Sequence, residues 1–158
     1  MAESLIFLTE ADAMRRDEII AILQRIPELE ICTFDTLALT RKAMRSRMPR
    51  LMIGPWSQGG ETMLAARASV AGNAACVPVP QALVLTGNVS PARISLTREA
   101  GSAELIPCDP LDRVGLFNRI TFLLGGANAL LDVLGRKNPP ALDQALESLP
   151  ALRRRLVA

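Results

Sequence analysis

The feature that most constrains the fold is a regular alternation of short apolar runs with helical patterns along the chain. Five apolar runs have the composition of strands buried on both faces of a sheet. They lie at residues 4–9, 30–34, 51–54, 82–86 and 104–106. Helical patterns follow them at residues 12–26, 36–48, 61–70, 90–101 and from residue 111 onward. Short connections between alternating strands and helices predict a doubly wound α/β fold with a five-stranded parallel sheet.

Capping residues indicate where several of these helices begin and end. Asp12 stands at the N-cap position of the first helix, and Pro27 is expected to end that helix. Ser90 followed by Pro91 has the pattern of an N-cap with proline in the first turn. Gly101 stands where a C-terminal glycine usually ends a helix.

Histidine is absent from the 158 residues, and this absence excludes several chemistries. Ser-His-Asp and Cys-His hydrolysis, histidine-ligated zinc and phosphodonation from histidine all require an imidazole. The apolar stretches are shorter than the roughly 20 residues of a membrane span, and the first residues do not resemble a signal peptide. We therefore expect a cytoplasmic protein without a membrane partner.

The three cysteines predict neither a disulfide framework nor a metal site. Cys32, Cys76 and Cys108 are odd in number, far apart and outside any CxxC motif. We expect them to be buried, inert thiols.

Three segments resemble the receiver domains of two-component response regulators, over residues 4–124. Residues 5–16 (LIFLTEADAMRR) are similar to the first strand and helix of chemotaxis-type receivers, whose loop carries paired acidic residues that hold Mg²⁺. Residues 49–56 (PRLMIGPW) are similar to the third strand, which ends in the phospho-accepting aspartate. Residues 82–87 and 97–110 resemble the fourth and fifth strands. The resemblance implies a CheY-like, flavodoxin-like sheet with strand order 2-1-3-4-5.

Carried over residue by residue, the resemblance implies a receiver that has lost its phosphorylation chemistry. The acidic pair falls on Thr9 and Glu10, and the phospho-accepting aspartate falls on Pro55. Phosphoryl transfer to a carboxylate needs that nucleophile and a divalent cation held by clustered acids. We therefore predict no phosphorylation, no catalytic residue, no metal site and no cofactor.

The remaining conserved positions of a receiver are only partly kept. The switch threonine falls on Thr86, and the switch aromatic falls on Leu105. The phosphate-binding lysine falls on Cys108, or on Asp109 if Pro110 matches the family's proline. Neither residue carries the positive charge that stabilises a phosphoryl group.

Other features of the strand-end loops have structural interpretations that we favour. Glu10 and Asp12 near Asp109 could form a carboxylate cluster, but we expect Asp12 to cap a helix and Glu10 to be solvated. Gly59 and Gly60 are expected to form a turn, since no phosphate-loop motif surrounds them.

Two surface features bear on partners. An exposed Trp56 indole beside the lost site would be a natural anchor for a partner protein or a planar ligand. Five cations also gather within ten residues, at Arg41, Lys42, Arg45, Arg47 and Arg50. With a formal net charge of only +2 and no recognition motif, we read them as a solvated helix face and expect no specific nucleic-acid binding.

The chain beyond residue 124 is predicted to be a helical tail, so that residues 1–124 and 125–158 form two parts. Gly125 and Gly126 are expected to interrupt its first helix, Gly135 to close it, and a second helix to begin at residues 139–140. Apolar residues recur at heptad spacing from the fifth predicted helix into this tail: Phe117, Ile120, Leu124, Ala127, Leu131 and Leu134. This stripe fits either a hairpin packed on its own domain or a dimer or partner-binding surface, and we favour a homodimer.

Taken together, the sequence predicts a pseudo-receiver that is not an enzyme and works by binding proteins whose identity is unknown. The alternative is a sensor that binds a metabolite or nucleotide in the degenerate pocket, which is lined by Thr9, Pro55, Trp56, Thr86 and Cys108. A flavodoxin-like enzyme is the weakest candidate, because no complete catalytic constellation is present.

Overall fold

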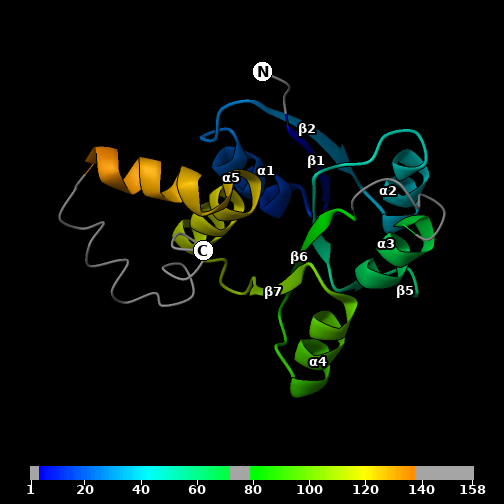
Figure 1. The fold of residues 1–158 in the computed structure, drawn as a ribbon. Coiled ribbons are helices and arrows are strands. Elements are labelled where there is room, and N and C mark those ends of the chain that lie inside the picture. Colours follow the sequence, from blue (N-terminus) through cyan, green and yellow to red (C-terminus); the bar gives the residue numbers. More distant parts are fainter. Residues whose placement is uncertain (1–3, 72–78, 138–158) are drawn as a thin grey trace. The chain divides into compact units, whose positions relative to one another are not determined.

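The computed structural model describes residues 4–71 and 79–137, and it describes side chains for residues 4–70 and 79–125. Its centre is a five-stranded sheet with strand order β2-β1-β3-β6-β7 (Figure 1). The strands are β1 (Ser4–Thr9), β2 (Leu29–Phe34), β3 (Leu51–Pro55), β6 (Gln81–Thr86) and β7 (Ala103–Pro107). All neighbouring pairs are parallel. Because β6 and β7 are the fourth and fifth strands of this sheet along the chain, the observed order is the predicted order 2-1-3-4-5. The predicted doubly wound fold is confirmed.

In the part of the chain that the structure describes, five helices follow the strands of the sheet. They are α1 (Ala13–Leu23), α2 (Leu37–Met44), α3 (Met63–Ala71), α4 (Pro91–Ala100) and α5 (Arg113–Lys137). The side chain of Asp12 accepts a hydrogen bond from the backbone N–H of Met14 at 2.9 Å, which confirms the predicted N-cap. Ser90 likewise caps α4, which begins at Pro91 and ends before Gly101, whose φ is 71°. Helices α1 and α2 end earlier than predicted, at Leu23 and Met44.

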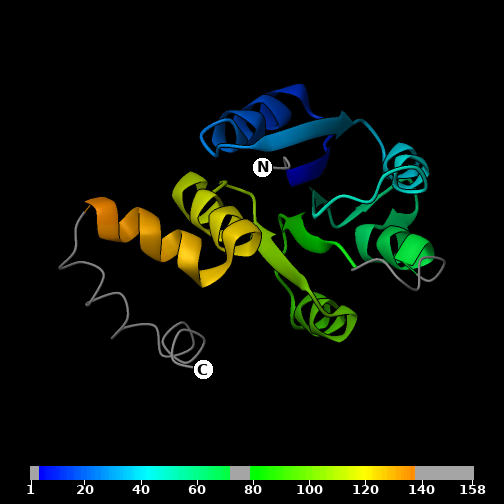
Figure 2. The ribbon, with the colours of Figure 1, turned by 45° about the horizontal axis from the view of Figure 1, so that its top comes forward.

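The two faces of the sheet carry separate apolar cores. Side chains of Phe7, Met52 and Val84 face α2 and α3, where Leu37 and Met63 complete one cluster. Residues one position along each strand point to the opposite face. There Ile6, Leu8, Ile53 and Leu83 are buried, as are Ile19, Ile22 and Leu23 of α1. Figures 1 and 2 show α1 on the opposite side of the sheet from α2 and α3.

A small hairpin replaces the start of the predicted third helix. Its strands β4 (Ser57–Gln58) and β5 (Glu61–Thr62) pair antiparallel across a two-glycine turn. Gly59 and Gly60 have φ values of 59° and 79°, a conformation that glycine adopts without strain. The prediction of a glycine turn is confirmed, but the prediction of a helix from residue 61 is wrong because these residues pair across the turn.

The chain forms two compact units, Met1–Leu116 and Phe117–Ala158. Helix α5 begins in the first unit and continues to Lys137. The predictions that Gly125 and Gly126 interrupt this helix and that Gly135 closes it are therefore wrong. The predicted second tail helix lies outside the described residues, and the division at residue 124 stays a prediction. Within residues 4–71 and 79–137, no helix is long and apolar enough to cross a membrane.

Candidate functional site

The carboxyl ends of four strands bring together most of the residues predicted to form the site. Thr9, Pro55 and Thr86 are the last residues of β1, β3 and β6. The backbone N–H of Cys108 donates to the carbonyl of Thr86 at 3.1 Å, which holds the end of β7 beside β6. Leu105 differs from these residues, because it lies within β7 opposite Val84.

Thr9 and Glu10, the predicted positions of the acidic pair, both form hydrogen bonds within the chain. The hydroxyls of Thr9 and Thr40 form a buried hydrogen bond that links β1 to α2. Glu10 is buried, and its Oε1 accepts the backbone N–H of Asp12 at 3.1 Å. The prediction that Glu10 is solvated is therefore wrong, because the turn after β1 supplies a donor that folds its carboxylate inward.

The backbone of β3 is closely packed at Gly54, the residue before Pro55. A Cβ atom added to Gly54 would lie 3.2 Å from Cβ of Thr9 and 3.2 Å from Sδ of Met63. Pro55 follows Gly54 and pairs with Leu85 of β6. Proline has no side-chain oxygen and no backbone N–H, so this position offers neither a nucleophile nor a donor.

Thr86, the predicted switch position, has a hydroxyl whose donor and acceptor sites are all used in hydrogen bonds within the chain. Its side chain is buried, donates to the carbonyl of Asn88 at 2.8 Å and accepts the N–H of Asn88 at 3.1 Å. It also accepts a hydrogen bond of 2.7 Å from Nη1 of Arg93. A hydroxyl has one donor and two acceptor sites, and all three are used.

Arg93 is a residue of the site that the sequence analysis missed. Its guanidinium binds Thr86 and lies 4.9 Å from the centre of the Trp56 ring. The available signal was a cation in the first turn of a helix, where the helix dipole disfavours positive charge unless the side chain finds another partner.

Neither of the two residues predicted to replace the phosphate-binding lysine carries a positive charge. Cys108 is buried, as predicted for a thiol, and Asp109 is exposed and joined to Pro110 by a cis peptide bond. Cys32 is half-buried, and Cys76 lies outside the described residues. In the described part of the chain, no group of three or more cysteines and acidic residues could hold a metal ion.

The loop after Pro55 is fixed to α2, which the sequence did not predict. Gln58 in the hairpin accepts the N–H of Leu37 at 2.8 Å and donates to the carbonyl of Asp35 at 2.8 Å. Glu61 accepts two hydrogen bonds of 2.9 Å from Arg41 of α2. The hairpin therefore stabilises the first turn of α2 and is itself held against that helix.

Trp56 is half-buried, whereas the sequence analysis considered an exposed indole. It packs against the core cluster below α2 and α3 and lies under Arg93. Its ring lines a groove of about 390 Å³ between α3 and α4, together with Leu64 and Leu96. Trp56 is thus partly accessible at an apolar groove within the first unit.

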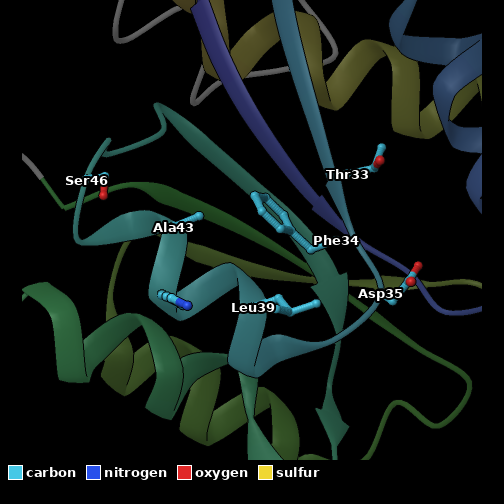
Figure 3. A pocket seen from close by; sticks show the side chains of 7 residues that line it. Thr33, Phe34, Asp35, Leu39, Ala43 and Ser46 are labelled. Carbon is cyan, nitrogen blue, oxygen red and sulfur yellow. The ribbon is translucent and has the colours of Figure 1, made fainter.

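A second, shallow hollow of about 500 Å³ lies between β2 and α2. Figure 3 shows the ring of Phe34 beside Ala43 and Leu39 of α2, while Thr33 and Asp35 point away from the helix. On the neighbouring basic face, Arg41 pairs with Glu61 and Arg47 pairs with Glu30. Internal ion pairs thus neutralise part of the positive charge that the sequence places there.

The predicted stripe of the tail lies on α5. The structure describes the side chains of three stripe residues on this helix, Phe117, Ile120 and Leu124. Of these, Ile120 and Leu124 are buried. Leu131 and Leu134 belong to the same helix, but their side chains lie outside those that the structure describes. The role of the stripe in self-association therefore stays a prediction.

Comparison with solved structures finds the same fold in receiver domains. The Vibrio cholerae chemotaxis protein CheY4 is 15% identical, and the match covers 77% of this chain and 99% of that one with a TM-score of 0.66. The receiver domain of a DNA-binding response regulator from Colwellia psychrerythraea is 15% identical and matches 78% of this chain and 99% of that one, with a TM-score of 0.67.

A third similar structure is the receiver domain of the response regulator NarL from Mycobacterium tuberculosis. It is 11% identical, and the match covers 76% of this chain and 94% of that one with a TM-score of 0.64. No protein-family model and no curated protein matches the sequence. The chain therefore has the CheY-like receiver fold, and its function must be argued from its own residues.

Proposed function

We propose that this chain is a non-phosphorylatable pseudo-receiver that acts as a protein–protein interaction module in signalling. The observation that carries the proposal is Pro55 at the end of β3, where phosphoryl transfer would need a nucleophilic oxygen. The surrounding polar groups support it, because Thr9 and Thr86 have their hydroxyls bonded within the chain. A domain without this chemistry must act through its surfaces.

The hydrogen bonds at the strand ends also bear on the two rival functions. A small-ligand sensor would need free polar groups to recognise its ligand, whereas Thr9 and Thr86 are engaged with Thr40 and Arg93. An enzyme would need a nucleophile or an acid–base pair, and Pro55 supplies neither. We therefore propose a signalling protein that is not an enzyme. We also propose that it is cytoplasmic and that it associates with itself as a homodimer through the apolar stripe on α5.

The phosphorylation part of the proposal is tested with acetyl phosphate and Mg²⁺. We expect the intact mass of the full chain to stay unchanged under conditions that phosphorylate a functional chemotaxis receiver, which serves as the positive control. A mass increase of one phosphoryl group, lost again on treatment with hydroxylamine, would show an acyl phosphate and refute the proposal.

A further inference from the structure

The groove between α3 and α4 combines an apolar lining with one carboxylate. Trp56, Leu64 and Leu96 supply large apolar side chains, and Glu99 supplies the charge. Leu96 and Glu99 lie three residues apart on α4, so they occupy neighbouring positions on one helix face. All of these residues belong to the first compact unit.

Contacts at both ends of α4 hold the groove in shape. Near its beginning, Arg93 binds Thr86 and packs on Trp56. At its end, the buried side chain of Arg67 from α3 donates to the carbonyls of Ala100 and Gly101 at 3.2 and 2.7 Å. A surface that is ordered before binding loses less conformational entropy when a partner arrives.

The accessible groups of the groove define the chemistry of what it can bind. The side chain of Leu96 is 51% exposed, so a partner can reach it from solvent. Glu99 is exposed, and it takes part in no ion pair within the described residues. A complementary ligand therefore carries an apolar side chain and a positive charge close to it.

We propose that this groove binds an amphipathic helix of a partner protein. The helix inserts an aliphatic or aromatic anchor beside Trp56 and Leu96, and it places a lysine or arginine one turn away against Glu99. A groove between two helices suits this mode of recognition, in which a third helix lays its apolar face into the hollow. The inference rests on the proposed function as an interaction module and specifies the partner.

The test uses the full chain and a phage-displayed library of random peptides of about 16 residues, long enough for roughly four helical turns. We expect the selected peptides to share a large apolar residue with lysine or arginine three or four positions away. Trp56 is the only tryptophan of the chain, so its fluorescence reports directly on binding of each synthetic, tryptophan-free peptide. The expected result is a saturable change in its emission.

Two substitutions with matched controls locate the binding. We expect Leu96→Gln to weaken peptide binding by about tenfold, the effect of losing an apolar contact at a binding centre. Leu39 on α2 is 50% exposed and lines the other hollow, so Leu39→Gln should leave the affinity unchanged. Glu99→Lys should weaken binding by about fivefold. Asp17→Lys, an exposed position on α1, makes the same charge change away from the groove.

A last experiment exchanges the charges of Glu99 and of the basic residue of the peptide. Peptides in which glutamate replaces the basic residue should bind the Glu99→Lys chain better than the original chain. The inference is refuted if selection enriches no such peptides, if they carry acidic residues instead, or if Leu39→Gln weakens binding as much as Leu96→Gln. These outcomes are independent of the acetyl phosphate experiment, so a failed groove and a failed pseudo-receiver proposal are distinguishable.

Discussion

At the scale of single residues, the structure depends on a buried arginine, Arg67, that forms no ion pair with the acidic side chains that the structure describes. Arg67 is 3% exposed and donates to the carbonyls of Pro80, Ala100, Gly101 and Ser102 at 2.7 to 3.2 Å. Burial lowers the pKa of its guanidinium from the usual value. Two of the carbonyls belong to the end of α4, where the helix dipole favours a positive charge.

Replacing Arg67 tests how much these hydrogen bonds contribute. We expect Arg67→Met to lower the free energy of unfolding by about 3 kcal/mol, since buried carbonyls lose charged donors. Arg67→Lys should recover only part of this loss, because an ammonium lacks the planar fork of donors. Urea unfolding measures both values. Arg98→Met, at an exposed position of α4, is the control, and an equal loss there would contradict the assignment.

A surface ion pair predicts a measurable pH dependence. Arg47 donates two hydrogen bonds of 2.7 Å to Glu30, and these bonds hold the pKa of the Glu30 carboxyl below its usual value. A lowered folded-state pKa means that the pair stabilises the fold above the unfolded pKa of about 4.3 and loses this effect as the pH falls through the folded value.

The check is an NMR titration of the Glu30 side chain. We expect its pKa to return toward the usual value in the Arg47→Gln variant, and to rise with added salt in the original chain. A Glu30 pKa that is the same in both proteins would contradict the ion pair in solution. Arg45→Gln, an exposed cation on the same basic segment, is the matched control.

The hydrogen bonds that the sequence could predict are those that join residues close together along the chain. Asp12 caps an N–H two residues away, and Ser90 caps one three residues away. Gln58 binds residues 21 and 23 positions distant, and Arg67 reaches carbonyls more than 30 positions away. Such contacts depend on how the elements pack, which no local pattern describes.

At the scale of secondary-structure elements, the β4–β5 hairpin is the main departure from the predicted order. The helical periodicity of the alanine-rich segment predicts a helix from residue 61. The missed signal is Thr62, whose hydroxyl accepts the N–H of Ala65 at 3.1 Å as an N-cap does. Recognising this cap would have moved the start of α3 to Met63.

The turn of this hairpin predicts the effect of glycine substitutions. Gly60 has a φ of 79°, so Gly60→Ala should lower the free energy of unfolding by about 1 kcal/mol through backbone strain. Gly87 is the control, because an added Cβ there meets open space and its φ lies outside the left-handed region. Thermal unfolding of both variants measures the difference, and a loss that is equal in the two would contradict the strain.

At the scale of the whole molecule, the fold was predictable because the apolar runs and their connections leave few topologies. The surface against which the helical tail packs was not predictable from the sequence, because a heptad stripe can pack on its own domain or on a second copy. We expect the full chain to be a homodimer and the double substitution Leu131→Gln and Leu134→Gln to shift it toward monomer. Light scattering measures the mass, and an unchanged dimer in this variant would contradict a role for the stripe.

The strand order also has a consequence for synthesis on the ribosome. The neighbouring strands β2, β1 and β3 all lie before residue 56, so they leave the ribosome before β6 and β7 do. Nascent chains can fold during synthesis, starting from the N-terminal part. One half of the sheet can therefore assemble first, leaving the edge of β3 as the template to which β6 and then β7 add.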